Sequence, residues 1–241
     1  MYDLIFGPIN SRRLGRSLGI NLTPNKTCNL DCVYCECGKT TKLSNKREAF
    51  YTTEHVLEEL RKKINAVGHI DYITFSGTGE PALFKDIKEL VKGIKKEHPD
   101  KKLAVITNAT LFTDKDVFDA FLEADLILPS VDSVLKAGFS KINRPHTDLN
   151  LKDILASLLK FRDEYKGKFW VEVFICPGIN DTEEELDAIA LYLKKLRPEK
   201  VQVNTLDRKP TEAWVKVPDQ SSIDRVMKAF KDFDVDLVLR K

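Results

Sequence analysis

Three closely spaced cysteines constrain this chain of 241 residues more than any other feature of its sequence. Cys28, Cys32 and Cys35 form a C-x3-C-x2-C loop. The loop offers three thiolates, one fewer than a closed zinc site or a four-cysteine iron–sulfur site needs. Three cysteine ligands on a four-iron cluster would leave one iron free to bind a substrate or cofactor. The spacing therefore favours an iron–sulfur loop with an open coordination position.

A zinc site completed by a distant residue and unpaired thiols in a reduced protein are the alternatives. Zinc ribbons and fingers usually carry two pairs of ligands, and the sequence has no second C-x2-C pair. Cys37 and Cys176 could share a second metal, but we expect them to be inert. A disulfide framework is not expected, because five cysteines is an odd number and no apolar signal segment opens the chain.

Length and charge limit the class of protein. The length suits one α/β domain of the barrel type. Lys and Arg number 39 against 37 Asp and Glu, so the total charge gives no strong nucleic-acid signature, although a local basic patch is compatible with it. No apolar run reaches the roughly 18 residues of a membrane span. The unpaired cysteines predict a reducing, cytoplasmic location.

Strand-like and helix-like segments alternate along the chain, which predicts parallel βα units in a single domain over residues 1–241. The core spans about 17–205, with an arginine-rich lead-in (1–16) and a C-terminal extension (206–241). The predicted strands are 17–22, 72–75, 103–107, 126–128, 170–175 and 201–204, with a last one at 235–239. The predicted helices are 53–67, 84–97, 115–123, 151–165, 182–196 and 221–230.

Polar clusters follow the predicted strands, where parallel α/β folds gather functional residues. Residues 76–81 read Ser-Gly-Thr-Gly-Glu-Pro, and the two glycines would let the backbone approach a ligand closely, although an ordinary βα turn has the same composition. Asn108, Ser130 and Asp132 end the next two strands, where they could equally cap helices. Ile179 lies in the turn after the fifth strand.

Two basic patches are candidates for substrate contacts. Arginines before the first barrel strand would suit a bidentate grip on phosphate or carboxylate, or could pair with surface acids. The second patch lies around residues 143–146 and at the end of the sixth strand, although a histidine there is more often a surface or packing residue. The candidate substrate contacts are Arg12, Arg13, Arg16, Asn143, Arg144, His146, Asn204 and Arg208.

The cysteine loop, with Tyr34 just before its last cysteine, resembles the signature of the radical S-adenosylmethionine (SAM) superfamily. The resemblance implies a partial (β/α)6 TIM-like barrel and a [4Fe–4S] cluster on Cys28, Cys32 and Cys35. It also implies that SAM binds through a Gly-Gly-Glu-type turn, strand-end polar groups and an apolar wall. The corresponding residues are Gly77, Thr78, Gly79, Glu80, Asn108, Ser130, Asp132, Tyr34 and Ile179.

The resemblance further implies an enzyme that cleaves SAM reductively to a 5′-deoxyadenosyl radical. An external one-electron donor, a ferredoxin or flavodoxin, would reduce the cluster. The radical would take hydrogen from a small molecule or from a peptide or protein side chain, neither of which the sequence identifies.

Residues 11–19, 76–81, 142–146 and 202–208 resemble one branch of the superfamily, the Fe–S oxidoreductases related to the wyosine-forming tRNA enzymes (4-demethylwyosine synthases). No cysteine precedes Cys28 to bind a second cluster, and the near-neutral charge gives no tRNA-binding surface. Modification of a tRNA base is therefore an alternative function, and a non-catalytic metal-binding module is another.

Overall fold

An eight-stranded sheet organises the protein in the order β1-β2-β5-β6-β7-β8-β9-β10. The computed structural model describes residues 3–11 and 14–238, so Arg12 and Arg13 lie outside the described residues. The strands from β2 to β10 pair in parallel. The parallel strands are β2 (Gly15–Ile20), β5 (Tyr72–Phe75), β6 (Lys102–Thr107), β7 (Leu126–Pro129), β8 (Lys168–Phe174), β9 (Lys200–Asn204) and β10 (Val235–Val238).

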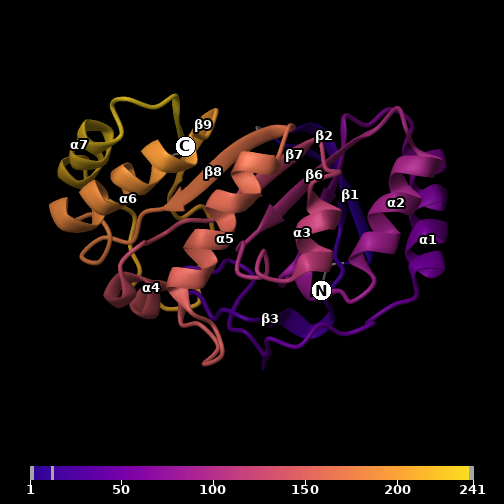
Figure 1. The fold of residues 1–241 in the computed structure, drawn as a ribbon, viewed down its shortest axis with the longest axis horizontal. Helices are drawn as coiled ribbons and strands as arrows, with labels where there is room; N and C mark the ends of the chain where they lie inside the picture. The colour runs from indigo at the N-terminus through magenta and orange to yellow at the C-terminus, as the bar shows by residue number, and fades with distance from the viewer. Residues whose placement is uncertain (1–2, 12–13, 239–241) are drawn as a thin grey trace.

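Helices cover the outer face of this curved sheet (Figure 1). Several begin at a side-chain cap of the kind that stabilises a first helical turn: Thr52, Asp114, Asn150 and Thr182 accept hydrogen bonds from backbone N–H groups. Their apolar faces pack on the sheet in one large core. The helices are α1 (Thr53–Val67), α2 (Ile87–Glu97), α3 (Lys115–Phe121), α5 (Leu151–Glu164), α6 (Glu183–Leu196) and α7 (Gln220–Ala229).

The inner face of the sheet carries both apolar and polar side chains. At the amino ends, Leu14, Ala104 and Leu126 form a small buried cluster. Beside this cluster, Thr74 pairs in register with Ala104, and its hydroxyl bonds to that of Ser17 at 2.6 Å. A barrel filled only for stability carries bulky branched residues in these layers. This buried polar pair therefore points to a functional lumen.

The predicted α/β partial barrel is confirmed, with additions at its edges and at its mouth. β1 (Ile5–Ser11) pairs antiparallel with β2, and the predicted last strand joins the sheet beside β9. Two features that the pattern did not predict are α4 (Lys136–Asn143) and the two-residue strands β3 (Thr27–Cys28) and β4 (Lys42–Leu43).

Most predicted boundaries lie within two residues of the observed ones, and the largest difference is at the start of α2. The helix expected to start at Phe84 starts at Ile87, because residues Pro81–Leu83 form a short 3-10 turn and Phe84 is extended. Over the part of the chain that the structure describes, no helix is both long and apolar enough to cross a membrane.

Candidate functional site

The three clustered cysteines line one pocket at the carboxyl ends of the parallel strands. Cys28 belongs to β3, while Cys32 and Cys35 lie in the loop that follows. The pocket has a volume of about 250 Å³, and its other walls come from the turn at 77–80 and from Asn108 and Ser130. The fold thus brings together the cysteine loop and three of the predicted strand ends.

Each of the three sulfurs faces one nitrogen donor. The Nζ of Lys26 lies 2.9 Å from Cys35 Sγ. The amide of Asn143 lies 3.4 Å from Cys32 Sγ, and that of Asn108 lies 3.8 Å from Cys28 Sγ. Donors of this kind stabilise negative charge on sulfur and tune the potential of iron–sulfur clusters.

The thiols differ in how readily they ionise. Burial raises the pKa of Cys28 to about 12 and that of Cys32 well above its ordinary range. The pKa of Cys35 is lowered to about 5 by a hydrogen bond from Cys37 and by the charge of Lys26. Since the thiolate is the form that binds metal, Cys35 is already prepared, whereas the other two need a cation to ionise.

Glycine is required where the turn after β5 meets the cysteine loop. Gly77 has a φ of 144°, which side chains disfavour. A Cβ on Gly79 would lie 1.8 Å from the carbonyl oxygen of Thr27. The N–H of Thr78 donates to Asn21 Oδ1 at 3.0 Å. The turn is therefore held against the segment that leads into Cys28.

Glu80 ends this turn as a buried carboxylate with three donors. Its Oε1 accepts from the Thr107 hydroxyl at 2.6 Å and the Ala82 N–H at 3.1 Å, and its Oε2 accepts from the Asn108 N–H at 2.8 Å. Burial nevertheless raises its pKa to about 7. A carboxylate has about four lone-pair sites, so Oε2 has room for one more donor.

Asn108 links the next strand end to the cysteine loop. Its side-chain amide donates to Asn29 Oδ1 at 2.8 Å, and its Oδ1 accepts from the N–H of Thr110 at 3.0 Å. Ser130 follows β7, and its N–H donates to the Thr107 carbonyl at 2.9 Å. Both residues line the pocket, and their role in binding SAM stays a prediction.

Asp132 lies behind Tyr34. Its carboxylate accepts from the Tyr34 hydroxyl at 2.7 Å, the Asn143 amide at 2.7 Å and the Phe174 N–H at 2.9 Å. Burial raises its pKa to about 6. Tyr34 stacks on Phe174 with ring centroids 3.9 Å apart, and Ile179 packs in the same apolar cluster. In this arrangement Asp132 fixes the orientation of the tyrosine ring.

Three of the predicted substrate residues have partners of their own. Arg16 is the second residue of β2, at the amino end of the strand, and its guanidinium donates to the Val67 carbonyl at 3.1 Å. Arg144 pairs with Glu212. His146 Nδ1 lies 3.5 Å from Asp148 Oδ2. The structure does not bring Arg16 to the pocket.

Asn204 and Arg208 lie at the carboxyl end of β9 and just beyond it. Asn204 Oδ1 is buried and has no hydrogen-bond partner among the described residues. Arg208 Nε donates to Glu36 Oε2 at 2.8 Å. Because Glu36 follows Cys35, this contact joins the end of the sheet to the cysteine loop.

Two charged residues of the pocket, Lys26 and Glu172, are not among the residues predicted from the sequence. Lys26 was overlooked because an isolated lysine in a loop resembles any solvated charge. Glu172 also lines the cysteine pocket. The sequence could have indicated it, because an acidic residue between Val171 and Val173 in a strand must face the side opposite to the two valines.

Cys37 and Cys176 lie in different surroundings. Cys37 Sγ is 3.5 Å from the Gly77 carbonyl, whereas Cys176 is buried in an apolar cluster. Within residues 3–11 and 14–238, no three His, Cys, Asp or Glu side chains are placed to hold a single metal ion. The ligands of an iron–sulfur cluster bind different irons and do not need to converge on one ion.

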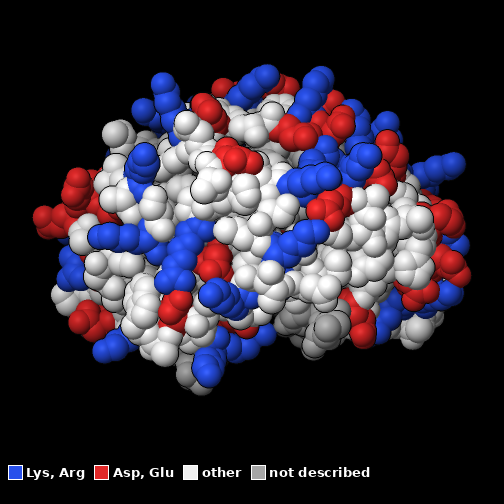
Figure 2. All heavy atoms as spheres, turned by 90° about the horizontal axis from the view of Figure 1, so that it is seen from below, with Lys and Arg blue, Asp and Glu red and all other residues white. Residues whose placement is uncertain are grey.

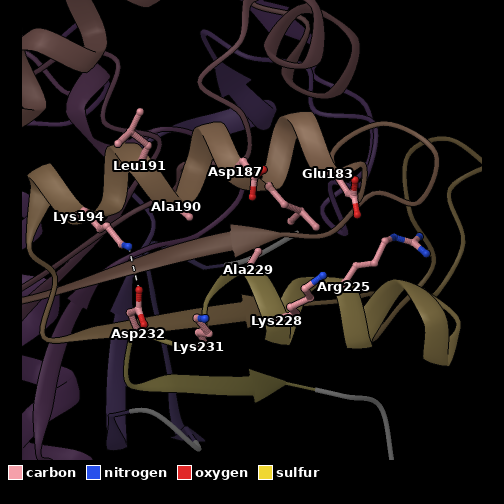
Figure 3. Close-up of a pocket in the computed structure, with 11 residues that line it drawn as sticks. Glu183, Asp187, Ala190, Leu191, Lys194, Arg225, Lys228, Ala229, Lys231 and Asp232 are labelled. Carbon is pink, nitrogen blue, oxygen red and sulfur yellow. Dashed lines mark ion pairs between the residues drawn. The ribbon is translucent and has the colours of Figure 1, made fainter.

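A larger surface hollow lies elsewhere, between α6 and α7 (Figure 3). Its volume is about 540 Å³ and its walls carry charges of both signs, including the ion pair of Lys194 and Asp232 at 2.8 Å. None of the predicted site residues lines it. The candidate site is therefore the smaller pocket that contains the cysteines.

Comparison with known proteins identifies the family. Residues 22–193 match the profile of the Radical SAM superfamily. The chain is 39% identical over 231 residues to the UPF0026 protein MJ1312 of Methanocaldococcus jannaschii, covering 95% of this chain and 71% of the relative. It is 35% identical over 227 residues to a protein named GTPase Obg of Brachyspira hyodysenteriae, covering 94% of this chain but only 33% of that relative.

A solved structure agrees on the fold. TYW1 with a bound lysine–pyruvate adduct superposes with a TM-score of 0.62 at 15% identity, over 90% of this chain and 74% of the other. The superfamily consists of Fe–S enzymes that use a [4Fe–4S] cluster and SAM. The chain belongs to the radical SAM superfamily, and within it to the UPF0026 proteins.

Proposed function

We propose that Cys28, Cys32 and Cys35 hold the [4Fe–4S] cluster and that SAM binds beside it against the turn at 77–80. The observation that carries this proposal is that the three cysteines and this turn line the same pocket. When bound, the cluster and SAM supply a 5′-deoxyadenosyl radical, which takes hydrogen from the substrate.

The residues present fit this pair of cofactors. Each sulfur has a nitrogen donor that stabilises negative charge on it. At Gly79 the backbone packs closer to the cysteine segment than a side chain would permit. The remaining lone pair on Glu80 Oε2 suits an ammonium group, since its other acceptor positions are occupied.

The remaining pocket residues would position SAM and exclude water. Tyr34, held by Asp132 and stacked on Phe174, offers with Ile179 an apolar wall for adenine. Asn108 and Ser130 offer hydrogen-bonding groups for the ribose or the carboxylate. A dry wall matters because a carbon radical must meet the substrate before it meets solvent or other reactive groups.

The proposed reaction is hydrogen abstraction from a small molecule or from a peptide or protein side chain, after an external ferredoxin or flavodoxin has reduced the cluster. Among the predicted substrate residues, Asn204 and Arg208 have the strongest structural support. Asn204 is the last residue of β9 and Arg208 follows that strand, at the end of the sheet where functional residues gather. Basic and acidic side chains are interspersed on the face beneath β3 (Figure 2), an arrangement that differs from the basic stripe of a tRNA-binding surface.

The test is anaerobic reconstitution with iron and sulfide, followed by dithionite, SAM and an assay for 5′-deoxyadenosine. Wild-type protein should form the nucleoside, and Cys32→Ala should lose both iron and cleavage. Cys176→Ala is the matched control, because this thiol is buried away from the pocket, and it should keep its iron. Full iron and cleavage in Cys32→Ala would refute the ligand assignment.

A further inference from the structure

A second hollow of about 390 Å³ adjoins the cysteine pocket on the side of the β1–β2 hairpin. The two hollows share Gly77, Gly79 and Ile106 as lining residues, so they are contiguous. We propose that this hollow binds the substrate, and that the substrate is a small molecule with a carboxylate or phosphate group. Its place in the reaction rests on the proposed function, but the binding of an anion does not depend on it.

One guanidinium in the lining suits an anionic ligand. Among the described residues that line the hollow, Arg208 has the only charged side chain, and none is an Asp or Glu. Glu36 orients its guanidinium through Nε and also accepts from the N–H groups of Asp207 and Arg208, at 2.8 and 2.9 Å. A guanidinium oriented in this way presents a planar set of donors that matches an oxyanion.

The rest of the lining suits a compact organic body. Phe6, Ile9 and Ile106 contribute apolar surface. The hydroxyls of Ser17 and Thr74 also line the hollow, and only one of their two hydrogens is used in the bond between them. A ligand oxygen could therefore accept the other.

Size and closure limit the ligand further. A volume of this order accommodates a metabolite-sized molecule. The hairpin closes one side, because the Phe6 ring covers Gly19 so closely that a Cβ there would lie 2.1 Å from it. The shared wall of Gly77 and Gly79 places the ligand next to the proposed SAM site, where a radical formed on SAM could reach it.

The experiment titrates reconstituted protein with two probes, benzoate and phenyl phosphate, by calorimetry. Arg208→Gln should weaken binding of the preferred probe by at least about tenfold, as expected for loss of a charge-assisted hydrogen bond. Arg208→Lys should fall between wild type and Arg208→Gln. Lys209→Gln removes the same charge one residue further on, from an exposed position outside the hollow, and should bind within twofold of wild type.

Comparison of the two probes identifies the oxyanion: tighter binding of benzoate indicates a carboxylate and tighter binding of phenyl phosphate a phosphate. No saturable binding to wild type, or equal losses in Arg208→Gln and Lys209→Gln, would refute the proposal. Iron content and substrate-free SAM cleavage are measured on the same samples. Wild-type protein that binds the probe but lacks iron would refute the cluster assignment and leave the anion site standing. Failure of the anion site and failure of the cluster assignment therefore give different results.

Discussion

At the scale of single residues, the three proposed ligand sulfurs differ in the charge of their donors. Cys28 and Cys32 face neutral amides, while Cys35 faces the ammonium of Lys26 at 2.9 Å. A positive charge beside a cluster favours its reduced, more negative state. Lys26 should therefore raise the reduction potential and make the cluster easier to reduce.

Lys26→Gln should accordingly lower the reduction potential of the reconstituted cluster by tens of millivolts, on the order expected for loss of one nearby charge. The measurement is an anaerobic redox titration followed by electron paramagnetic resonance. Lys39→Gln is the control, because this lysine is exposed on the same loop, and its potential should match that of wild type. Equal potentials in all three proteins would show that Lys26 does not act on the cluster.

Glu80 predicts a pH dependence of stability. Burial raises its pKa from 4.5 to about 7. The stabilisation of the folded protein that comes with this raised pKa is therefore fully present below pH 4.5 and is lost as the pH rises through 7. The stability of the cofactor-free protein relative to Glu80→Gln should fall by up to about 3 kcal/mol across that window. Urea unfolding at several pH values measures it, with Glu164→Gln as an exposed control. Parallel profiles for wild type and Glu80→Gln would contradict the prediction.

Individual site residues could be predicted from the sequence where they belong to a motif. They could not be predicted where tertiary structure alone brings them to the site. Glu80 and Asn108 follow strands, and their positions in the pocket follow from parallel topology. Asn143 was predicted as a substrate contact, but α4 carries it to within 3.4 Å of Cys32 Sγ. That distance depends on a short helix without a side-chain cap, and such a helix leaves little trace in the sequence.

At the scale of elements, the helices with caps and strong periodicity were predictable, whereas the β1–β2 hairpin was not. β1 carries a register irregularity between Phe6 and Ile9, which disturbs the alternation that marks a strand. The hairpin is held instead by a contact that alternation does not encode: the Phe6 ring occupies the space that a side chain on Gly19 would need.

Gly19→Ala should therefore destabilise the protein by about 1–3 kcal/mol, the usual cost of an overpacked site. The same substitution in a Phe6→Ala background should cost at least about 1 kcal/mol less, because the clash is removed. Urea unfolding of wild type, both single variants and the double variant completes the cycle. An equal cost of Gly19→Ala in both backgrounds would show that the two residues do not interact.

At the scale of the whole molecule, the segment after β9 is hydrogen-bonded to the cysteine loop. The Thr211 hydroxyl donates to the Cys35 carbonyl at 2.9 Å, and the Glu212 N–H donates to the Val33 carbonyl at 2.9 Å. Further on, Phe230 of the C-terminal region is fully buried in the main core. We therefore expect residues 206–238 to fold together with the barrel, although residues 206–241 are predicted from the sequence to be an extension outside the core.

The two tryptophans of the chain can test this expectation. Trp170 packs inside the barrel, and Trp214 lies in the segment that contacts the cysteine loop. In Trp214→Phe the fluorescence reports the barrel, and in Trp170→Phe it reports the segment. Each variant should show a fluorescence midpoint in urea that coincides with its own midpoint by circular dichroism, as in two-state unfolding. In Trp170→Phe, the fluorescence of Trp214 could instead change at a lower urea concentration than the circular dichroism. That result would mean that the cysteine loop loses these contacts while the barrel is still folded.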